Sequence, residues 1–227
     1  AAEVAIGASI RGARAMSCMK HVGLNVMADP IFTVSYIGAT GGLVFCVADD
    51  PGMHSSQNEQ DSRHYAKAAK IPMLEPSDSA ECKEFTKAAF KLSEEYDTPV
   101  FVRLSTRVSH SQSLVELCEP EEVALKPYEK NIPKHVMMPA MAKGRHVVVE
   151  ERTKKLLALA ETDAFNKVEN NGSRVGVITS GVSYEYAKEA LGDSVNYLKL
   201  GMVYPLPEKL ILDFAKGVDT LWCIEEL

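Results

Sequence analysis

Short apolar runs alternate with stretches of helical periodicity along most of this 227-residue chain. The runs at 42–48 and 100–104 are typical of buried strands, and helical patterns at 64–70 and 79–96 lie between them. Strands that alternate with helices are joined by crossover connections, which favour parallel pairing over hairpins. We therefore predict an α/β fold built on a parallel sheet.

The remaining elements follow the same rhythm. We predict a first helix that extends to about Met16, an irregular proline-containing arm at 115–149, and a helix over 150–168. Asp78 and Glu81 have the spacing of a capping box at the start of the helix that follows them. The other expected elements are strands at 17–20, 72–75, 174–179, 196–200 and 219–224, and helices at 24–37, 183–191 and 207–216.

The turn sequence Glu169-Asn170-Asn171-Gly172 predicts a domain boundary. We assign residues 1–165 to a first domain and residues 172–227 to a second, incomplete domain. The first helical pattern has no N-cap residue before it, and the last strand pattern closes at the final residues. We expect the chain to be an internal piece of a larger protein.

Composition excludes several classes of protein. The formal net charge of -6 argues against nucleic-acid binding, which favours a basic surface. No apolar run reaches the roughly 20 residues that cross a bilayer, and we expect no signal peptide. The five cysteines are far apart without a C-x-x-C pair, so local spacing predicts neither a zinc nor an iron–sulfur site. We expect a cytoplasmic protein in which Cys46 and Cys223 are buried, inert thiols.

Two polar loops follow two of the apolar runs. The loop at 49–63 is dense in carboxylates, amides and hydroxyls, and the loop at 105–113 follows the strand at 100–104. In an open α/β sheet, ligands bind at the carboxyl ends of the strands. Both loops are expected at the same edge of a parallel sheet, which makes this edge the best candidate for a ligand site.

Residue chemistry leaves alternatives open at this edge. Asp49, Asp50, His54 and Asp61 suit metal binding or acid–base chemistry, or the aspartates cap turns and the histidine is solvated. The segment Lys20–Asn25 precedes a helix and suits an anionic group at its start, or it is a helix entry without a ligand.

Two further features have a functional and a structural interpretation. Arg107 and His110 suit the binding of a carboxylate, or they are solvated surface residues. Gly181 suits a phosphate turn or a tight turn from strand to helix, and the tight turn is favoured. The sequence has no Ser-His-Asp order, Walker loop or G-x-G-x-x-G pattern.

Three segments resemble the 2-oxoacid:ferredoxin oxidoreductase family. Ala5–Met16 is similar to the opening helix of its pyrimidine-binding domain. Lys20–Asn25 and Asp49–Arg63 resemble the thiamine-diphosphate-bearing α subunits of its indolepyruvate-oxidising branch, and Thr106–His110 adds to the match. The resemblance is close over residues 1–165. The tail resembles the start of a transketolase-C-terminal-like domain, including Gly181 and the final Glu225-Glu226.

The resemblance implies oxidative decarboxylation of an aryl 2-oxoacid such as indolepyruvate, with coenzyme A taking the acyl group. Electrons would pass through iron–sulfur clusters in the full complex to ferredoxin. Thiamine diphosphate would carry the chemistry, with its Mg²⁺ held by a domain absent from this chain. A second subunit or further domains are therefore expected, in an oligomer. The family's catalytic glutamate aligns just before Ala1 rather than with Glu3, so the chain alone is expected to be inactive.

The resemblance also implies roles for individual residues. His21 and His54 are the candidate catalytic residues, and Lys20, Gly23 and Asn25 are the candidate cofactor contacts. No metal ligand is expected. The alternative functions are a non-catalytic docking or assembly module of a split 2-oxoacid oxidoreductase, and another α/β enzyme such as a different thiamine-diphosphate enzyme. The candidate substrate contacts are Asp50, Ser55, Ser56, Gln57, Arg63, Arg107 and His110.

Overall fold

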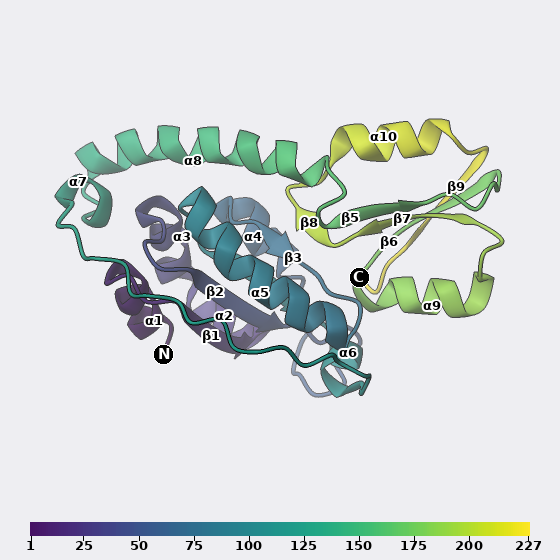
Figure 1. Ribbon diagram of the computed structural model, residues 1–227, viewed down its shortest axis with the longest axis horizontal. Helices are drawn as coiled ribbons and strands as arrows, with labels where there is room; N and C mark the ends of the chain where they lie inside the picture. Colours follow the sequence, from purple (N-terminus) through teal and green to yellow (C-terminus); the bar gives the residue numbers. More distant parts are fainter.

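The computed structural model describes all residues, Ala1–Leu227, and arranges them around two sheets (Figure 1). The first sheet has the strand order β1-β2-β4-β3-β8. Its first four strands are mutually parallel, and β8 runs antiparallel to β3. The predicted parallel sheet is confirmed, with a short antiparallel strand at one edge. The strands are β1 (Ala15–Lys20), β2 (Leu43–Ala48), β3 (Met73–Leu74), β4 (Val100–Leu104) and β8 (Met202–Tyr204).

Helices cover both faces of the first sheet, because successive residues of a strand point to opposite sides. Phe45 and Ile31 belong to the core on one face, whereas Val44 and Phe85 belong to the core on the other. Half of the capping box is confirmed, since the Asp78 carboxylate accepts a hydrogen bond from the Glu81 amide at 2.7 Å, whereas the Glu81 carboxylate accepts from the Ser77 amide at 2.9 Å and not from Asp78. The first face carries α1 (Ala2–Ile10), α2 (His21–Val26), α3 (Ala28–Ile37) and α4 (Arg63–Ala69), and the second carries α5 (Ser79–Tyr96).

The second sheet has the order β5-β7-β6-β9, with α9 and α10 on opposite sides (Figure 1). Strand β5 is antiparallel to β7, and the other pairs are parallel. This sheet takes its first strand from upstream of residue 172, and β8 returns to the first sheet. Division of the chain into 1–165 and 172–227 therefore stays a proposal. The elements are β5 (Asn166–Glu169), β6 (Val175–Ser180), α9 (Gly181–Leu191), β7 (Asn196–Leu200), α10 (Glu208–Lys216) and β9 (Thr220–Ile224).

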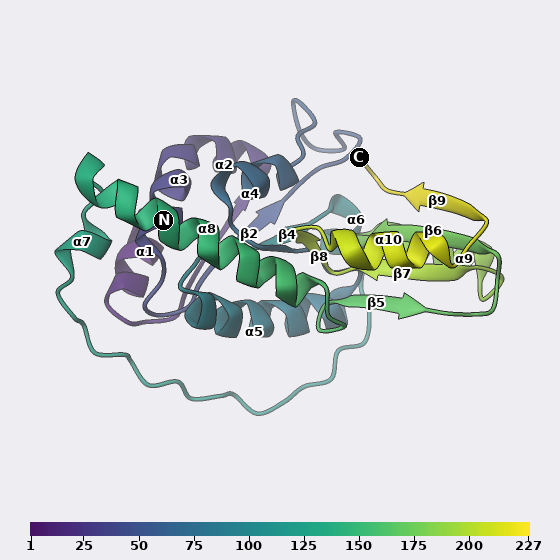
Figure 2. The same ribbon diagram turned by 90° about the horizontal axis from the view of Figure 1, so that it is seen from above.

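A long helix, α8 (Pro139–Ala160), lies across the molecule and leads into the second sheet (Figure 1). The predicted helix over 150–168 is wrong at both ends, because Pro139 is tolerated in the first turn of α8 and β5 occupies the end of that range. Between α6 (Thr106–His110) and α7 (Ile132–His135), an extended arm runs around the outside of the first sheet and its helices (Figure 2).

Two arginines, one buried and one half-buried, fasten α8 to helices of the first sheet. Arg152 donates to the backbone oxygens of Asp97 and Ser35, at 2.7 and 2.8 Å. Arg145 donates to the backbone oxygen of Tyr36 at 2.6 Å and to the Asp97 carboxylate at 3.0 Å. These acceptors lie at the last turns of α3 and α5, where carbonyl groups lack partners within their helix. These arginines therefore add hydrogen bonds to the apolar contacts that the buried Val149, Leu156 and Ala160 of α8 make.

Other predictions need correction. The first helix ends at Ile10 rather than Met16, because Gly12 adopts a φ of 91° that ends helical geometry. The loop predicted at 105–113 contains the short helix α6. Cys223 is exposed on β9, whereas Cys46 is half-buried, and all five cysteines are free. No helix has the length and apolar character needed to cross a membrane.

Candidate active site

Three parallel strands of the first sheet end at the same level. Lys20, Ala48 and Leu104 are paired across β1, β2 and β4 as the last residues of those strands. The residues that follow are therefore brought together at one edge, as predicted from the two polar loops. This edge gathers Lys20, the loop 49–63 and α6.

Asp50 organises the outer part of the polar loop. Its carboxylate accepts hydrogen bonds from the amides of His54 and Ser55, at 3.1 and 2.8 Å. It also accepts from the hydroxyls of Ser56 and Thr106, both at 2.6 Å. The hydroxyls of Ser56 and Thr106 are the main cause that holds the pKa of Asp50 well below its usual range. An ionised Asp50 therefore shapes the segment in which the candidate substrate contacts lie.

Lys20 reaches the same place from β1. Its ammonium group donates to the backbone oxygen of Ser55 and lies 3.6 Å from the Asp50 carboxylate. The side chain is 35% exposed, so the cation remains accessible to an anionic group at the sheet edge. The structure therefore brings together Lys20, Asp50, Ser55 and Ser56 from the predicted set.

Asp49 and Asp61 do not form a metal site with Asp50 and His54. Asp49 accepts from Arg103 at 2.6 Å and from the Ser62 hydroxyl at 2.8 Å. Asp61 accepts from the Arg63 guanidinium at 2.9 Å, and no group of three His, Cys, Asp or Glu side chains has an arrangement that suits a metal ion. Both aspartates instead fasten the loop by hydrogen bonds and ion pairs, which is the structural alternative for these residues.

The remaining loop candidates differ in their surroundings. His54 and Gln57 are exposed to solvent. Arg63 turns toward the end of the chain, where it donates to Glu225 at 2.7 Å. Arg107 and His110 are exposed on α6, which Thr106 ties to the loop. These two residues therefore lie beside the loop without a side-chain partner of their own.

His21, Gly23 and Asn25 lie on α2, just beyond Lys20. His21 is fully buried, and neither of its ring nitrogens has a hydrogen-bond partner. Asn25 accepts a hydrogen bond from the Tyr65 hydroxyl at 2.7 Å. Gly23 lines a cavity of about 600 Å³ that opens beside β1. A Cβ atom at Gly23 would approach the Met19 side chain to 3.1 Å, so a larger residue would crowd this wall.

The cavity beside β1 combines apolar walls with a few polar groups. Its lining includes the apolar side chains of Met19, Val26 and Met27. Ser17 and Asp29 also line it and supply hydrogen-bonding groups. A flat heterocycle that carries ring nitrogens and an amino group suits such a cavity, because it needs apolar contact on its faces and polar partners at its edge.

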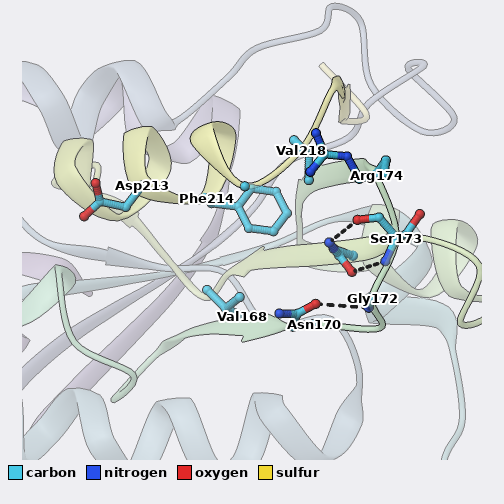
Figure 3. Close-up of a pocket in the computed structure, with 10 residues that line it drawn as sticks. Val168, Asn170, Gly172, Ser173, Arg174, Asp213, Phe214 and Val218 are labelled. Carbon is cyan, nitrogen blue, oxygen red and sulfur yellow. Dashed lines mark hydrogen bonds between the residues drawn. The ribbon is translucent and has the colours of Figure 1, made fainter.

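A second cavity, of about 370 Å³, lies in the second sheet's half of the molecule, where β6 and β7 begin and α10 ends (Figure 3). Its amides are already used within the protein. Asn196 accepts from the amides of Asn171 and Ser173, and its own amide group donates to the Ser173 oxygen. We therefore place the candidate active site at the first sheet and the cavity beside β1.

Sequence reasoning missed two residues of the site. Thr106 was recognised only as part of a motif, although its hydroxyl links α6 to Asp50. Arg103 is 2% exposed and pairs with both Asp49 and Glu75. Burial raises the pKa of Glu75, although the nearby Arg103 opposes this effect. The available signal was a single charged residue inside the apolar run Val100–Leu104.

Gly181 forms a tight turn from strand to helix. It begins α9 directly after β6, with a φ of 51°. A Cβ atom at this position would lie 2.6 Å from a carboxylate oxygen of Glu75, so the close approach requires glycine.

The fold and the site together define an α/β protein with a candidate ligand site at the carboxyl edge of a parallel sheet. Residues 1–190 match the family described as "Pyruvate flavodoxin/ferredoxin oxidoreductase, thiamine diP-bdg", and the chain belongs to this family. The resemblance seen in the sequence is thereby confirmed.

Relatives narrow the family membership. Indolepyruvate oxidoreductase subunit IorA of Archaeoglobus fulgidus is 44% identical over 99% of this chain, which covers 37% of that relative. The subunit of the same name from Methanothermobacter marburgensis is 43% identical over 100% of this chain and 38% of its own length. The chain therefore spans a little over a third of the length of the curated relatives it matches.

Solved structures support the fold. The 2-oxoglutarate:ferredoxin oxidoreductase from Magnetococcus marinus has a TM-score of 0.71 and 15% identity over 97% of this chain and 47% of that chain. A split gene transketolase has a TM-score of 0.58 and 16% identity over 98% of this chain and 61% of that chain. At these identities the likeness concerns the fold alone.

The low pKa of Asp50 predicts an acid-sensitive contribution to stability. Below about pH 4 the unfolded Asp takes up a proton, whereas the folded carboxylate resists it. The free energy of unfolding should therefore fall as the pH drops from 6 to 3, and it should fall less in Asp50→Asn. Urea unfolding at the two pH values measures this difference. Asp163→Asn, which removes an exposed carboxylate without an ion pair, should behave as the wild type; equal acid sensitivity in Asp50→Asn would contradict the prediction.

Proposed function

We propose that this chain is part of a thiamine-diphosphate-dependent subunit that oxidises an aryl 2-oxoacid such as indolepyruvate. The observation that carries the proposal is the 42–44% identity, over nearly the whole chain, to relatives named indolepyruvate oxidoreductase subunit IorA. The candidate site supports it, because a cation and a polar loop lie beside a cavity that suits a flat heterocycle.

The proposed reaction is an oxidative decarboxylation. The bond between the keto carbon and the carboxylate breaks, which releases CO₂. The acyl carbon forms a bond to the sulfur of coenzyme A, and the thiol gives up its proton. Two electrons leave the acyl carbon and pass through iron–sulfur clusters of the full complex to ferredoxin, one electron for each one-electron acceptor.

The cavity beside β1 fits the pyrimidine end of thiamine diphosphate. Met19, Val26 and Met27 would contact the faces of the ring, and Ser17 and Asp29 offer partners for its polar edge. When bound, the cofactor supplies the means to stabilise a carbanion at the former keto carbon. The protein supplies position and charge around it.

The diphosphate and its Mg²⁺ are assigned to another domain or to a second subunit. The acidic side chains of the polar loop are engaged with arginines and hydroxyls, and no group of three His, Cys, Asp or Glu side chains offers a donor set for a divalent cation. The cavity is also open, and its lining includes Ala1, Ala2 and the 87% exposed Val26. Exposed apolar residues at an open cavity suit contact with a further domain, in a larger oligomer.

The polar loop and Lys20 would form the substrate side of the site. The accessible Lys20 ammonium suits the carboxylate of a 2-oxoacid, and Arg107 and His110 offer further hydrogen-bonding groups at the same edge. His54, exposed in the loop that Asp50 shapes, would position the substrate or move a proton. His21 is buried at the start of α2, directly after Lys20, and would be the second catalytic residue.

A cytoplasmic location is also part of the proposal. All five cysteines are free, which suits a reducing compartment.

Activity of the complete enzyme tests the proposal. The full-length subunit, produced with its partner subunit, should reduce ferredoxin in the presence of indolepyruvate, coenzyme A, Mg²⁺ and thiamine diphosphate. We expect kcat/KM for indolepyruvate to exceed that for 2-oxoglutarate by at least about tenfold. A preference for 2-oxoglutarate would contradict the substrate class. Absence of 2-oxoacid oxidation in the reconstituted complex would favour an assembly role.

His54 gives a residue-level test of the substrate side. Replacing a general acid–base or positioning group is expected to lower turnover by more than about tenfold, so His54→Asn in the complete enzyme should show such a loss in kcat with indolepyruvate. His146→Asn is the matched control, because His146 is also an exposed histidine but lies on α8, where it contacts Glu150 and not the loop. Equal rates in the two variants would remove His54 from the site.

A further inference from the structure

Arg103 is an arginine almost without solvent contact inside the central strand β4. The side chain is 2% exposed and its neighbours along the strand are apolar. A buried charge is costly unless it is paired and hydrogen-bonded. The groups that Arg103 pairs with therefore indicate its structural role.

Arg103 holds both ends of the polar loop. Its Nε donates to the Asp49 carboxylate at 2.6 Å and lies 3.9 Å from the Asp61 carboxylate. Asp49 begins the loop, and it also accepts from the Ser62 amide and hydroxyl at 3.0 and 2.8 Å. The entry and exit of the loop are thus joined around one guanidinium group, whereas His54 and Gln57 between them are exposed.

The same guanidinium extends toward the second sheet. Arg103 Nη1 donates to Glu75 at 2.6 Å, and Glu75 lies against Gly181 at the start of α9. On the other side of Asp61, Arg63 donates to Glu225 near the end of the chain. One ion pair, between Arg63 and Glu225, and the contact of Glu75 with Gly181 therefore connect the loop to the second sheet.

We propose that Arg103 is the positioning residue of this site, holding the loop 49–63 in register with Lys20 and α6 and coupling its position to the second sheet. The effect on catalysis rests on the proposed function, whereas the position of the loop follows from the hydrogen bonds of Asp49 with Arg103 and Ser62.

The shape of the guanidinium group explains why arginine occupies this place. Asp49 and Glu75 are bound by different nitrogens of one planar fork. A lysine carries the same charge at a single point, so it cannot present two fixed donors in these directions. Arg103→Lys therefore retains the charge and removes the geometry.

The test compares Arg103→Lys with Arg152→Lys in the full-length subunit within its complex. Arg152 is a matched control, because it is also a buried arginine with two backbone acceptors but contacts α3 and α5 rather than the loop. Hydrogen exchange reports the protection of loop amides without reference to activity. Steady-state rates with indolepyruvate report the effect on catalysis.

In Arg103→Lys, exchange across residues 50–62 should rise and kcat/KM should fall by about tenfold or more, since a displacement of about 1 Å is known to cost on the order of a hundredfold in rate. Arg152→Lys should leave both unchanged, even where its melting temperature falls. Asp49→Asn, which loses the charge but keeps an acceptor, is the second variant if Arg103→Lys fails to assemble, and it should raise loop exchange in the same way.

Equal loop exchange in the variants at Arg103, Asp49 and Arg152 would overturn the positioning role. Raised loop exchange with an unchanged kcat/KM would overturn its catalytic importance. A wild-type complex without 2-oxoacid oxidation would instead refute the proposed function, because the exchange result does not depend on turnover.

Discussion

The candidate site depends on the register of three parallel strands. Lys20, Ala48 and Leu104 end β1, β2 and β4 side by side, so the segments that follow have to leave the sheet at one edge. Parallel pairing requires a crossover after each strand, and the helices of those crossovers bury both faces of the sheet. Because both faces are covered, the polar side chains of the site gather at the edge where the strands end.

The sequence could predict this edge but not the charges beneath it. Apolar runs identified β2 and β4, and a polar segment after each run indicated where the site would lie. Arg103 was hidden because its acceptors, Asp49 and Glu75, come from distant segments that only the folded sheet brings together. The start of α8 was hidden because Arg145, rather than a buried apolar side chain, fastens that end of the helix. Strand β8 pairs with a strand far back in the chain, which local periodicity does not report.

The two halves of the candidate site differ in physical character. The cavity beside β1 offers methionine and valine walls to a ring, whereas the loop 49–63 offers an ionised network shaped by Asp50. Lys20 lies at the end of the same strand that supplies Ser17 and Met19 to the cavity. A cofactor ring in the cavity and an anionic substrate at the loop would therefore be held by neighbouring residues of one strand. This arrangement explains how one sheet edge would serve both ligands.

Binding of thiamine diphosphate tests the central claim, that the cavity beside β1 takes the cofactor's pyrimidine ring. Val26 lines this cavity and is 87% exposed, so Val26→Trp narrows it without disturbing the core. Calorimetry on the complete complex with Mg²⁺ should show a Kd at least about tenfold higher in Val26→Trp, since every 1.4 kcal/mol of lost contact is tenfold in affinity. The same substitution at Val147, exposed on α8, should leave the Kd unchanged. Wild-type affinity in Val26→Trp would contradict the account.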